Sequence, residues 1–314
     1  MSRPKHTPIE YRNYALPAYF PIISLSGDNW HISDIPSGTL HFHNCLEIGL
    51  CETDNGTLEF SDTQSEFSAG DVTIIASDVA HTTYSAPGKS SKWSYLFVNV
   101  EDLLSPYFPL DIISNNGSLQ NLLRNYRAIL SKKDYPDIHF LVSSIITEME
   151  NKPTNFQFSV RGLMLSLITK LINLYDEAKS TNSDSIQAHE NSLVISPALY
   201  FIRKNYHLDF PMEDLADLCH MSSTHFRRTF SSIMGFGALE YVNRIRITHA
   251  STMLRTTEMP ILDISEEIGF HSVSSFNRHF MDIIGMTPSQ YRKQMSCIRD
   301  RSIMRCTGWL TPPR

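Results

Sequence analysis

The sequence predicts a two-domain α+β protein, with a sheet-rich N-terminal domain and an all-helical C-terminal domain. Short apolar runs broken by Gly, Pro, Asn and Asp fill residues 10–110, which is typical of strands in a sandwich or small barrel. From Gly117 the spacing of apolar residues becomes helical. After a polar stretch at 176–192 the helical spacing continues to Gln294 and contains an internal repeat.

The N-terminal domain is predicted to have two parts. Residues 1–110 form the sheet-rich part, and residues 111–175 form a helical segment. Within that segment, helices are expected over 119–130, 138–149 and 160–175. One face of the third helix is lined with leucines, which suits either packing against the sheets or a dimer seam.

A polar linker is predicted to separate the two domains. It covers residues 176–194 and holds little apolar surface. The helical domain then spans 195–295, and a tail covers 296–314.

Composition narrows the class of protein. The chain has 314 residues, of which 41% are hydrophobic and 19% charged, as expected of globular domains. No apolar run approaches the roughly 18 residues of a membrane span, and Met1–Phe20 lacks the apolar core of a signal peptide. Five scattered cysteines without a Cys-x-x-Cys pair indicate a reducing compartment, with neither a disulfide framework nor a zinc finger. We therefore expect a cytoplasmic protein, close to the nucleoid if it binds DNA, and without membrane contact.

Charge is distributed unevenly along the chain. The net charge is −6, but residues 195–314 carry 14 basic and 11 acidic side chains, against 13 and 22 in residues 1–194. The less acidic half is therefore C-terminal. This difference supports nucleic-acid binding only weakly, so the placement of individual arginines must carry the argument.

Two stretches of the C-terminal region match each other at an offset of 50 residues. They are CHMSSTHFRRTFSSIMG at 219–235 and GFHSVSSFNRHFMDIIG at 269–285. The identical pairs are Ser222 and Ser272, Phe226 and Phe276, Arg228 and Arg278, Phe230 and Phe280, Ile233 and Ile283, and Gly235 and Gly285. The repeat predicts one structural unit that is used twice.

Each repeat predicts a helix, a tight turn and a second helix. In the first unit a helix begins at Pro211 with Leu215 and Leu218 facing inward, His220-Met221 makes the turn, and Ser222 or Ser223 caps the next helix. In the second unit the helix at 261–268 is followed by a turn at Phe270-His271 and a cap at Ser272. A helix over Ala238–Arg255 joins the two units. This arrangement is a pair of helix-turn-helix units.

The second helix of each unit turns polar side chains outward. Its inner stripe holds two Phe and one Ile, at Phe226, Phe230 and Ile233 in the first unit. Outward Arg can pair with guanine and Asn with adenine in the major groove of DNA, so the outward residues are candidates for DNA binding. They are Thr224, His225, Arg227, Arg228 and Ser231 in the first unit, and Ser274, Ser275, Asn277 and Arg278 in the second.

The C-terminal region resembles the DNA-binding domain of the AraC/XylS family of transcription regulators. The stretches that carry the resemblance are DLADL at 214–218, HFRRTF at 225–230, YVNRIR at 241–246, ISEEIGF at 264–270, SFNRHF at 275–280 and GMTPSQYR at 285–292. The resemblance implies two recognition helices that enter successive major-groove segments of double-stranded DNA. It also implies a homodimer, a small-molecule effector such as a sugar, and contact with RNA polymerase if the protein is an activator.

The segment His41-Phe-His43-Asn-Cys45-Leu-Glu47 resembles the first motif of cupin barrels, and His81 stands where the second motif has its histidine. On one strand, alternation would send His41, His43, Cys45 and Glu47 to the same face. His41, His43, Glu47 and His81 are candidates for binding a small organic ligand, and three histidines with one carboxylate could instead hold a transition metal. Because Ile35, Ala76, Asp78 and Ser85 replace conserved glycine, proline and asparagine positions of the cupin motifs, we expect no metal and no cofactor.

Aromatic residues of the N-terminal domain are further ligand candidates. Trp30, Trp93 and Tyr95 could stack on a sugar, or they could simply fill the core. The stretch Tyr14–Pro21 could be an arm over a pocket mouth or an edge strand.

Three hypotheses for the whole chain follow. The first is a transcription regulator, not an enzyme, in which a small molecule in the N-terminal barrel controls DNA binding. The second is a DNA-bound regulator whose barrel only dimerises. The third is a metal-dependent cupin enzyme fused to DNA-binding helices.

Overall fold

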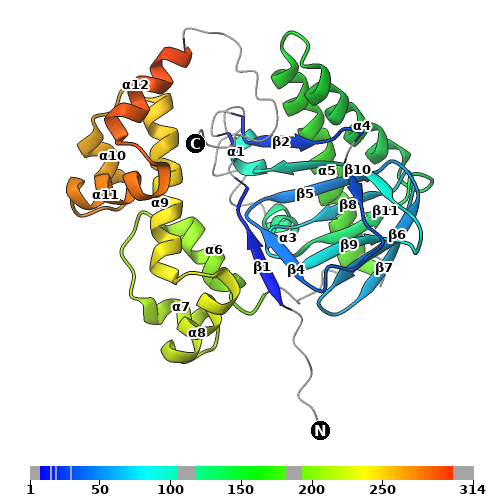
Figure 1. The fold of residues 1–314 in the computed structure, drawn as a ribbon, viewed down its shortest axis with the longest axis horizontal. Coiled ribbons are helices and arrows are strands. Elements are labelled where there is room, and N and C mark those ends of the chain that lie inside the picture. The colour runs from blue at the N-terminus through cyan, green and yellow to red at the C-terminus, as the bar shows by residue number, and fades with distance from the viewer. Residues whose placement is uncertain are drawn as a thin grey trace. The chain divides into compact units, whose positions relative to one another are not determined.

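The chain forms two compact units, Met1–Leu193 and Val194–Arg314. The computed structural model describes residues 8–104 except Ala15, Ala18, Tyr19 and Asn29, and also 117–181 and 193–299 (Figure 1). The expected division into a sheet-rich N-terminal domain and a helical C-terminal domain is confirmed. Most of the predicted linker at 176–194 and of the predicted tail at 296–314 lies outside the described residues.

Two sheets form the N-terminal unit. One has the strand order β1-β4-β9-β6-β7, and the other has the order β11-β8-β5-β10-β2 with the short β3 paired to β10. The strands are β1 (Ile9–Arg12), β2 (Ile22–Leu25), β3 (His31–Ile32), β4 (Leu40–His43), β5 (Leu46–Cys51), β6 (Asn55–Phe60), β7 (Gln64–Ser68), β8 (Val72–Ile75), β9 (His81–Ser85), β10 (Ser91–Val98) and β11 (Arg127–Leu130). Among the described strands, no ladder of hydrogen bonds joins the five-stranded sheet to the six-stranded one, so the barrel expected here is not closed.

The six-stranded sheet is buried on both faces. Ile48 and Leu50 of β5 pack in one cluster with the helices α4 (Pro136–Asn151) and α5 (Phe156–Thr181), which cover that face (Figure 1). Cys51 lies in a different cluster, which also holds Leu58 and Phe67 from the facing sheet. Since successive strand residues point to opposite faces, Glu47 shares the inner face with Cys51.

The helical segment after the sheets differs in one place from its prediction. The described helices are α1 (Val100–Leu104), α3 (Gly117–Asn125), α4 and α5. The helix expected over 119–130 is wrong beyond Asn125, because Arg127–Leu130 form β11 at the edge of β8. The Arg127 guanidinium donates two hydrogen bonds to the Asp62 carboxylate, at 2.6 and 2.8 Å. Pairing with the open edge of β8 and this ion pair override the helical spacing of the apolar residues.

The C-terminal unit is wholly helical in its described part. Its helices are α6 (Ser196–Asn205), α7 (Met212–Leu218), α8 (Ser223–Met234), α9 (Ala238–Thr256), α10 (Ile261–Glu267), α11 (Val273–Ile284) and α12 (Pro288–Arg299). The pairs α7–α8 and α10–α11 are the two predicted helix-turn-helix units, and α9 is the predicted joining helix. None of the described helices combines the length and apolar character that crossing a membrane requires.

Two details of the predicted inner faces are wrong. Leu218 is 39% exposed, because α7 ends there and turns its last residue to solvent. In α8 the fully packed stripe is Phe226, Phe230 and Met234, while Ile233 is only half-buried. The stripe therefore advances by four residues at each step, and Met234 takes the place expected for Ile233.

Candidate functional sites

The second helix of each unit has the same termini. The Ser222 hydroxyl accepts from the His225 backbone N–H at the start of α8, and the Ser272 hydroxyl accepts from the Ser275 N–H at the start of α11. Each helix ends at a glycine in the left-handed region, Gly235 or Gly285. Both caps fix where the helix begins and ends, so corresponding side chains leave the two helices at corresponding places.

The turns that precede these helices differ in length by one residue. The Met221 N–H donates to Ala216 O in the first unit, and the Phe270 N–H donates to Ser265 O in the second, an offset of 49 rather than 50. The left-handed position is His220 in the first turn, with φ 53°, and Gly269 in the second, with φ 88°. The second turn therefore holds one additional residue before its serine cap.

Most of the predicted DNA-binding side chains are exposed. Ser275 is half-buried, because it sits in the first turn of α11 beside the cap. The exposed ones are Thr224, His225, Arg227, Arg228, Ser231, Ser274, Asn277 and Arg278. Arg227 lies 3.9 Å from the Glu213 carboxylate, a contact too exposed to hold the guanidinium in place. Both helices thus offer donor and acceptor groups on a polar outer face.

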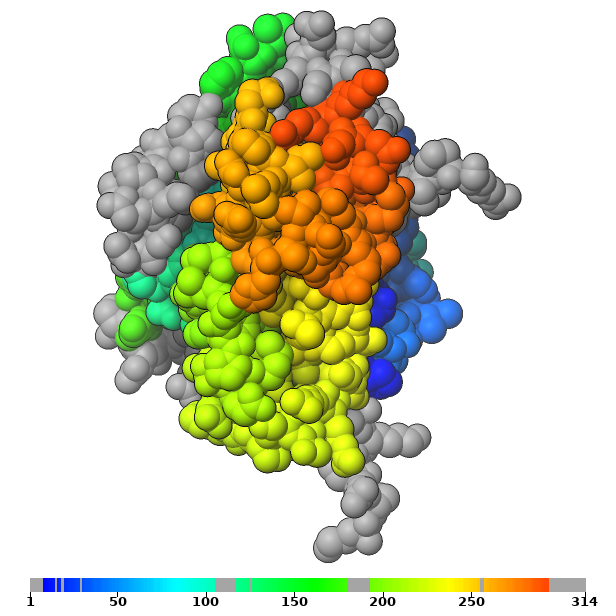
Figure 2. All heavy atoms as spheres, turned by 90° about the vertical axis from the view of Figure 1, so that its left-hand side faces the viewer, coloured from blue at the N-terminus to red at the C-terminus, as the bar shows by residue number. Residues whose placement is uncertain are grey.

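The helix α9 packs against helices of both helix-turn-helix units (Figure 1). Arg246 on α9 is largely buried, and its guanidinium donates to Tyr206 O at 2.6 Å and to Leu208 O at 3.0 Å. Gly269 lies directly against this site, since a Cβ there would come within 2.6 Å of His207 O. The surface of the domain is continuous from α8, in yellow-green, over α9 to α11, in orange (Figure 2).

The four predicted polar residues of the N-terminal unit come together, although not for the predicted reason. His41 and His43 lie on β4, His81 begins β9 and pairs with His41, and Glu47 lies on β5 of the other sheet. The chain leaves the strand at Asn44 and Cys45, so a single alternating strand does not produce the cluster. Instead, both sheets bring these groups to one end of the space between them. We call these four residues the histidine–glutamate cluster.

Glu47 is the centre of this cluster. Its carboxylate oxygens lie 3.1 Å from His43 Nε2 and 3.5 Å from His81 Nε2, and all three side chains are buried. Burial alone would raise the pKa of Glu47, but the adjacent His81 and His43 hold it well below its usual range. Burial, reinforced by His81, lowers the pKa of His41 to about 2. The cluster is therefore a buried carboxylate surrounded by imidazole rings.

Aromatic side chains fill the space between the sheets beyond the cluster. Trp93 is buried against Phe67 and stacks with Tyr95, and the indole N–H of Trp93 donates to Ser91 Oγ at 2.9 Å. The partly buried Trp30 packs against the same core. These three ligand candidates occupy core positions in the structure. Phe97 stacks with Tyr95 on the same face of β10, and it is not among the ligand candidates predicted from the sequence. Its alternation with Trp93 and Tyr95 along the strand is the signal that could have identified it.

Tyr14 covers the cluster from outside the strands. Its ring stacks on Phe97 at 3.9 Å and meets His43 edge-on at 5.9 Å. Asn44 holds the Tyr14 backbone by accepting from its N–H and donating to its carbonyl. Of the stretch Tyr14–Pro21, this residue therefore lies over the histidine end of the interior.

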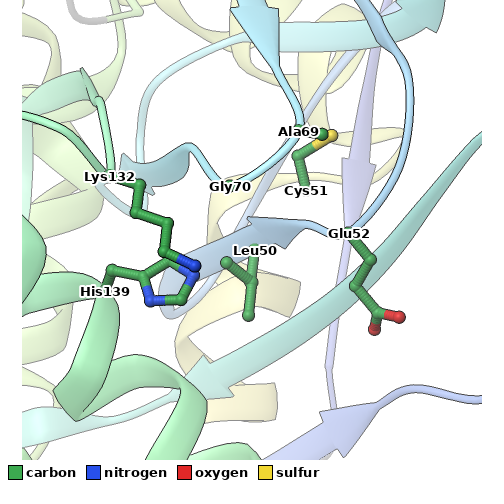
Figure 3. A pocket seen from close by; sticks show the side chains of 7 residues that line it. All are labelled: Leu50, Cys51, Glu52, Ala69, Gly70, Lys132 and His139. Atoms are coloured by element: carbon green, nitrogen blue, oxygen red, sulfur yellow. The ribbon is translucent and has the colours of Figure 1, made fainter.

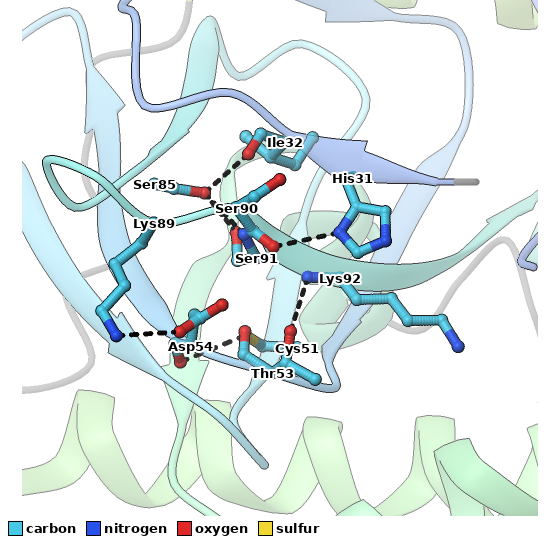
Figure 4. A network of polar contacts seen from close by, with 10 residues as sticks. All are labelled: His31, Ile32, Cys51, Thr53, Asp54, Ser85, Lys89, Ser90, Ser91 and Lys92. Atoms are coloured by element: carbon cyan, nitrogen blue, oxygen red, sulfur yellow. Dashed lines mark hydrogen bonds and ion pairs between the residues drawn. The ribbon is translucent and has the colours of Figure 1, made fainter. Parts of the chain in front are cut away.

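A polar network lies at the end of β9 and the start of β10, away from His81 (Figure 4). Ser85 donates to Ile32 O and contacts Ser91 Oγ, both at 2.7 Å. The Lys92 N–H donates to Thr53 Oγ1 at 3.0 Å. Because these polar groups form hydrogen bonds with one another, they are less available to a ligand than the polar groups at the histidine end.

Two surface cavities lie beside α4, away from the predicted ligand residues. One, of about 350 Å³, is lined by Leu50, Cys51, Glu52, Ala69, Gly70, Lys132 and His139 (Figure 3). The other, of about 380 Å³, is lined by Gly27, Asp28, Leu50, Glu52, Lys92, Ser94, Ser143, Ile146, Thr147 and Glu150. The walls of each cavity come from elements far apart in the sequence, so no sequence motif predicts either cavity.

Comparison with known proteins gives matches to DNA-binding regulators. A family model described as a helix-turn-helix domain matches residues 215–294. The melibiose operon regulatory protein of Escherichia coli is 31% identical over 120 residues, which are 38% of this chain and 39% of that protein. The lactose operon transcription activator of Staphylococcus xylosus is 24% identical over 243 residues, or 77% of this chain and 81% of that protein.

Two solved structures were also matched. The DNA-binding domain of AdpA in complex with a target DNA is 25% identical, with a TM-score of 0.32, over 35% of this chain and 97% of that one. An apo ToxT structure from Vibrio cholerae is 15% identical, with a TM-score of 0.38, over 89% of this chain and 99% of that one.

Proposed function

We propose, from the premise that this chain belongs to the AraC/XylS family of helix-turn-helix proteins, that it is a sequence-specific DNA-binding transcription regulator. The observation that carries the proposal is the pair of helices α8 and α11. They share a serine cap, a glycine end, a buried Phe pair and an exposed outer face with Arg228 or Arg278. Two such faces on one domain suit two successive major-groove segments of a DNA site.

Selection of duplex DNA from a random pool with the full-length protein tests this proposal. We expect enrichment of a site with two short conserved segments about one helical turn apart, one for each recognition helix. The bound sites should resist an excess of unrelated duplex DNA at physiological salt, because base contacts add to the salt-sensitive phosphate contacts. A pool that stays random after repeated rounds would contradict the proposal.

We propose further that a small organic molecule controls this activity through a cupin-like N-terminal domain. The names of the relatives, which refer to melibiose and lactose operons, make carbohydrates the first class to test. A thermal-shift screen of sugars and metabolites tests this, since a ligand that binds only the folded state raises the melting temperature. No stabilising compound across the screen would count against the effector.

The remaining parts of the proposal concern assembly. We propose a homodimer, and contact with RNA polymerase if the protein activates transcription. Phe140 on α4 and Phe158 on α5 are 65% and 63% exposed, which supports a dimer seam on the helical segment. Analytical ultracentrifugation of the wild type and of Phe140→Ser should distinguish a dimer from a monomer. Nothing in this proposal requires catalysis.

A further inference from the structure

We propose that the surface cavity beside α4 that Lys132 and His139 line binds a small organic carboxylate (Figure 3). Leu50, in the wall of this cavity, packs with the helices, so the site lies outside the space between the two sheets. It is therefore distinct from the histidine–glutamate cluster and from the aromatic ligand candidates. The inference depends neither on DNA binding nor on a sugar effector, because it rests on the shape and charge of this one cavity.

The first step in the argument is the charge of the cavity. Lys132 follows β11 and His139 lies in the first turn of α4, and both side chains line the same space beside Leu50 (Figure 3). Among the described residues, no carboxylate forms an ion pair with either of them. The carboxylates that are nearest in sequence are already engaged, because Asp134 accepts from Ser131 Oγ and Asp137 pairs with Lys170.

The second step is the pairing that these two groups offer. Burial, reinforced by the Lys132 ammonium, lowers the pKa of His139, so its ring is neutral at neutral pH and keeps one N–H donor. Lys132 then supplies the one positive charge of the pair. A carboxylate can take both groups at once, since one oxygen faces the ammonium while the other accepts from the imidazole N–H.

The third step is the way in which the Lys132 side chain is held. Gly70 has a left-handed φ of 95°, and a Cβ built on it would lie 3.2 Å from Lys132 Cδ and 3.3 Å from Lys132 Cβ. The aliphatic stem of Lys132 therefore lies directly against the glycine backbone. A lysine whose stem is already packed loses less conformational freedom when its ammonium binds an anion, so the site is partly formed in advance.

Glu52 is the acidic residue of the cavity wall, and its carboxylate has partners on the other side. It lies 3.1 Å from Lys92 Nζ and accepts from Ser94 Oγ at 2.5 Å. Figure 3 shows this carboxylate turned away from Lys132 and His139. The charge of Glu52 is therefore balanced in the neighbouring cavity, and the positive charge of Lys132 is left for a ligand.

The remaining wall of the cavity selects the class of anion. Leu50, Cys51, Ala69 and Gly70 present apolar or small groups, and the volume of about 350 Å³ is at the lower end of the range for small-molecule sites. One ammonium balances one carboxylate, whereas a phosphate dianion would keep an uncompensated charge in a partly buried site. We therefore expect a short aliphatic monocarboxylate, with its apolar body over Leu50 and Ala69.

Calorimetric titration of the full-length wild type tests the proposal. The probes are acetate, butyrate and hexanoate, with butanol as the uncharged analogue and inorganic phosphate as the other anion, all at constant ionic strength. We expect saturable binding of one butyrate or hexanoate per chain, with a Kd of about 1 mM or lower, and binding of butanol and phosphate that is at least tenfold weaker. If no carboxylate binds saturably, or if phosphate binds as tightly as butyrate, the proposal is overturned.

Variants locate the carboxylate. Lys132→Met keeps the stem but removes the ammonium, and His139→Leu removes the N–H donor, so each should weaken butyrate binding at least tenfold. The matched control is Lys133→Met, which removes the same charge from the exposed neighbouring residue outside the cavity wall and should bind like the wild type. Wild-type affinity in Lys132→Met, or an equal loss in Lys133→Met, would overturn the site. If His139→Leu does not fold, the comparison of the two lysine variants decides.

Discussion

Among single residues, the two helix-turn-helix units differ in the residue that adopts the left-handed backbone conformation of the turn. The left-handed position is held by His220 in the first turn and by Gly269 in the second. Histidine tolerates this backbone region at a cost, whereas the second turn has no space for any side chain. There the close approach of the His207 carbonyl and the Arg246 guanidinium leaves room only for hydrogen.

Gly269→Ala should therefore destabilise the C-terminal unit by about 1–3 kcal/mol, from backbone strain together with a clash against main-chain atoms. Urea denaturation followed by circular dichroism measures this change. The control is Gly162→Ala, in the helix α5, where a Cβ meets no atom within 4 Å and should stabilise by about 0.5–1 kcal/mol. Equal stability of the two variants would show that the turn has more room than the structure gives it.

At the scale of elements, the sequence was most informative where local signals agreed. The caps, the Phe stripe and the closing glycine all predicted α8 and α11, and the structure contains both helices. Local signals gave the wrong secondary structure where contacts with distant segments of the chain determine it. The spacing of Leu119 to Leu130 fits a helix, and only the open edge of β8 turns Arg127–Leu130 into a strand. Likewise, the histidine–glutamate cluster needs two sheets to meet, which no single strand can indicate.

Removing either serine cap should weaken the helix that follows it. Ser222→Ala and Ser272→Ala each leave a backbone N–H at the helix start without its side-chain acceptor, at a cost of about 0.5–2 kcal/mol. Chemical denaturation should show this loss, and Ser→Asp at the same positions should restore most of it. Ser232→Ala, on the exposed face of α8, is the matched control and should change stability little. If Ser222→Ala and Ser272→Ala lose no more stability than Ser232→Ala does, the helix starts are fixed by packing alone.

At the scale of the whole molecule, two units divide the proposed tasks. The N-terminal half carries the acidic excess, and the C-terminal half carries the basic one. Each unit has its own buried core in the structure, with Ile48 in one and Phe276 in another. The proposed sensing and DNA-binding activities can therefore be tested on separate units, and any control by an effector must act through a difference in its affinity for two states of the protein.

A fragment of residues 193–314 should fold and bind DNA without the N-terminal unit. Its affinity should be lower than that of the full chain if the intact protein dimerises, because a second DNA contact is lost. An effector found by thermal shift should alter operator affinity of the full chain roughly 5- to 150-fold, and that of the fragment not at all. Mobility-shift titrations of both proteins measure this. A fragment that still responds to the effector would show that the effector does not bind the N-terminal unit.

If α8 and α11 read DNA through their outer faces, a binding titration of arginine variants should show it. Arg228→Ala and Arg278→Ala are compared with the wild type and with Arg244→Ala, an exposed arginine of α9 that pairs with Glu240. On the selected site, each recognition-helix variant should lose about 1–3 kcal/mol and relax base preference in its own half of the site, while the control stays near the wild type. If both variants bind and discriminate like the wild type, the recognition faces are wrongly assigned.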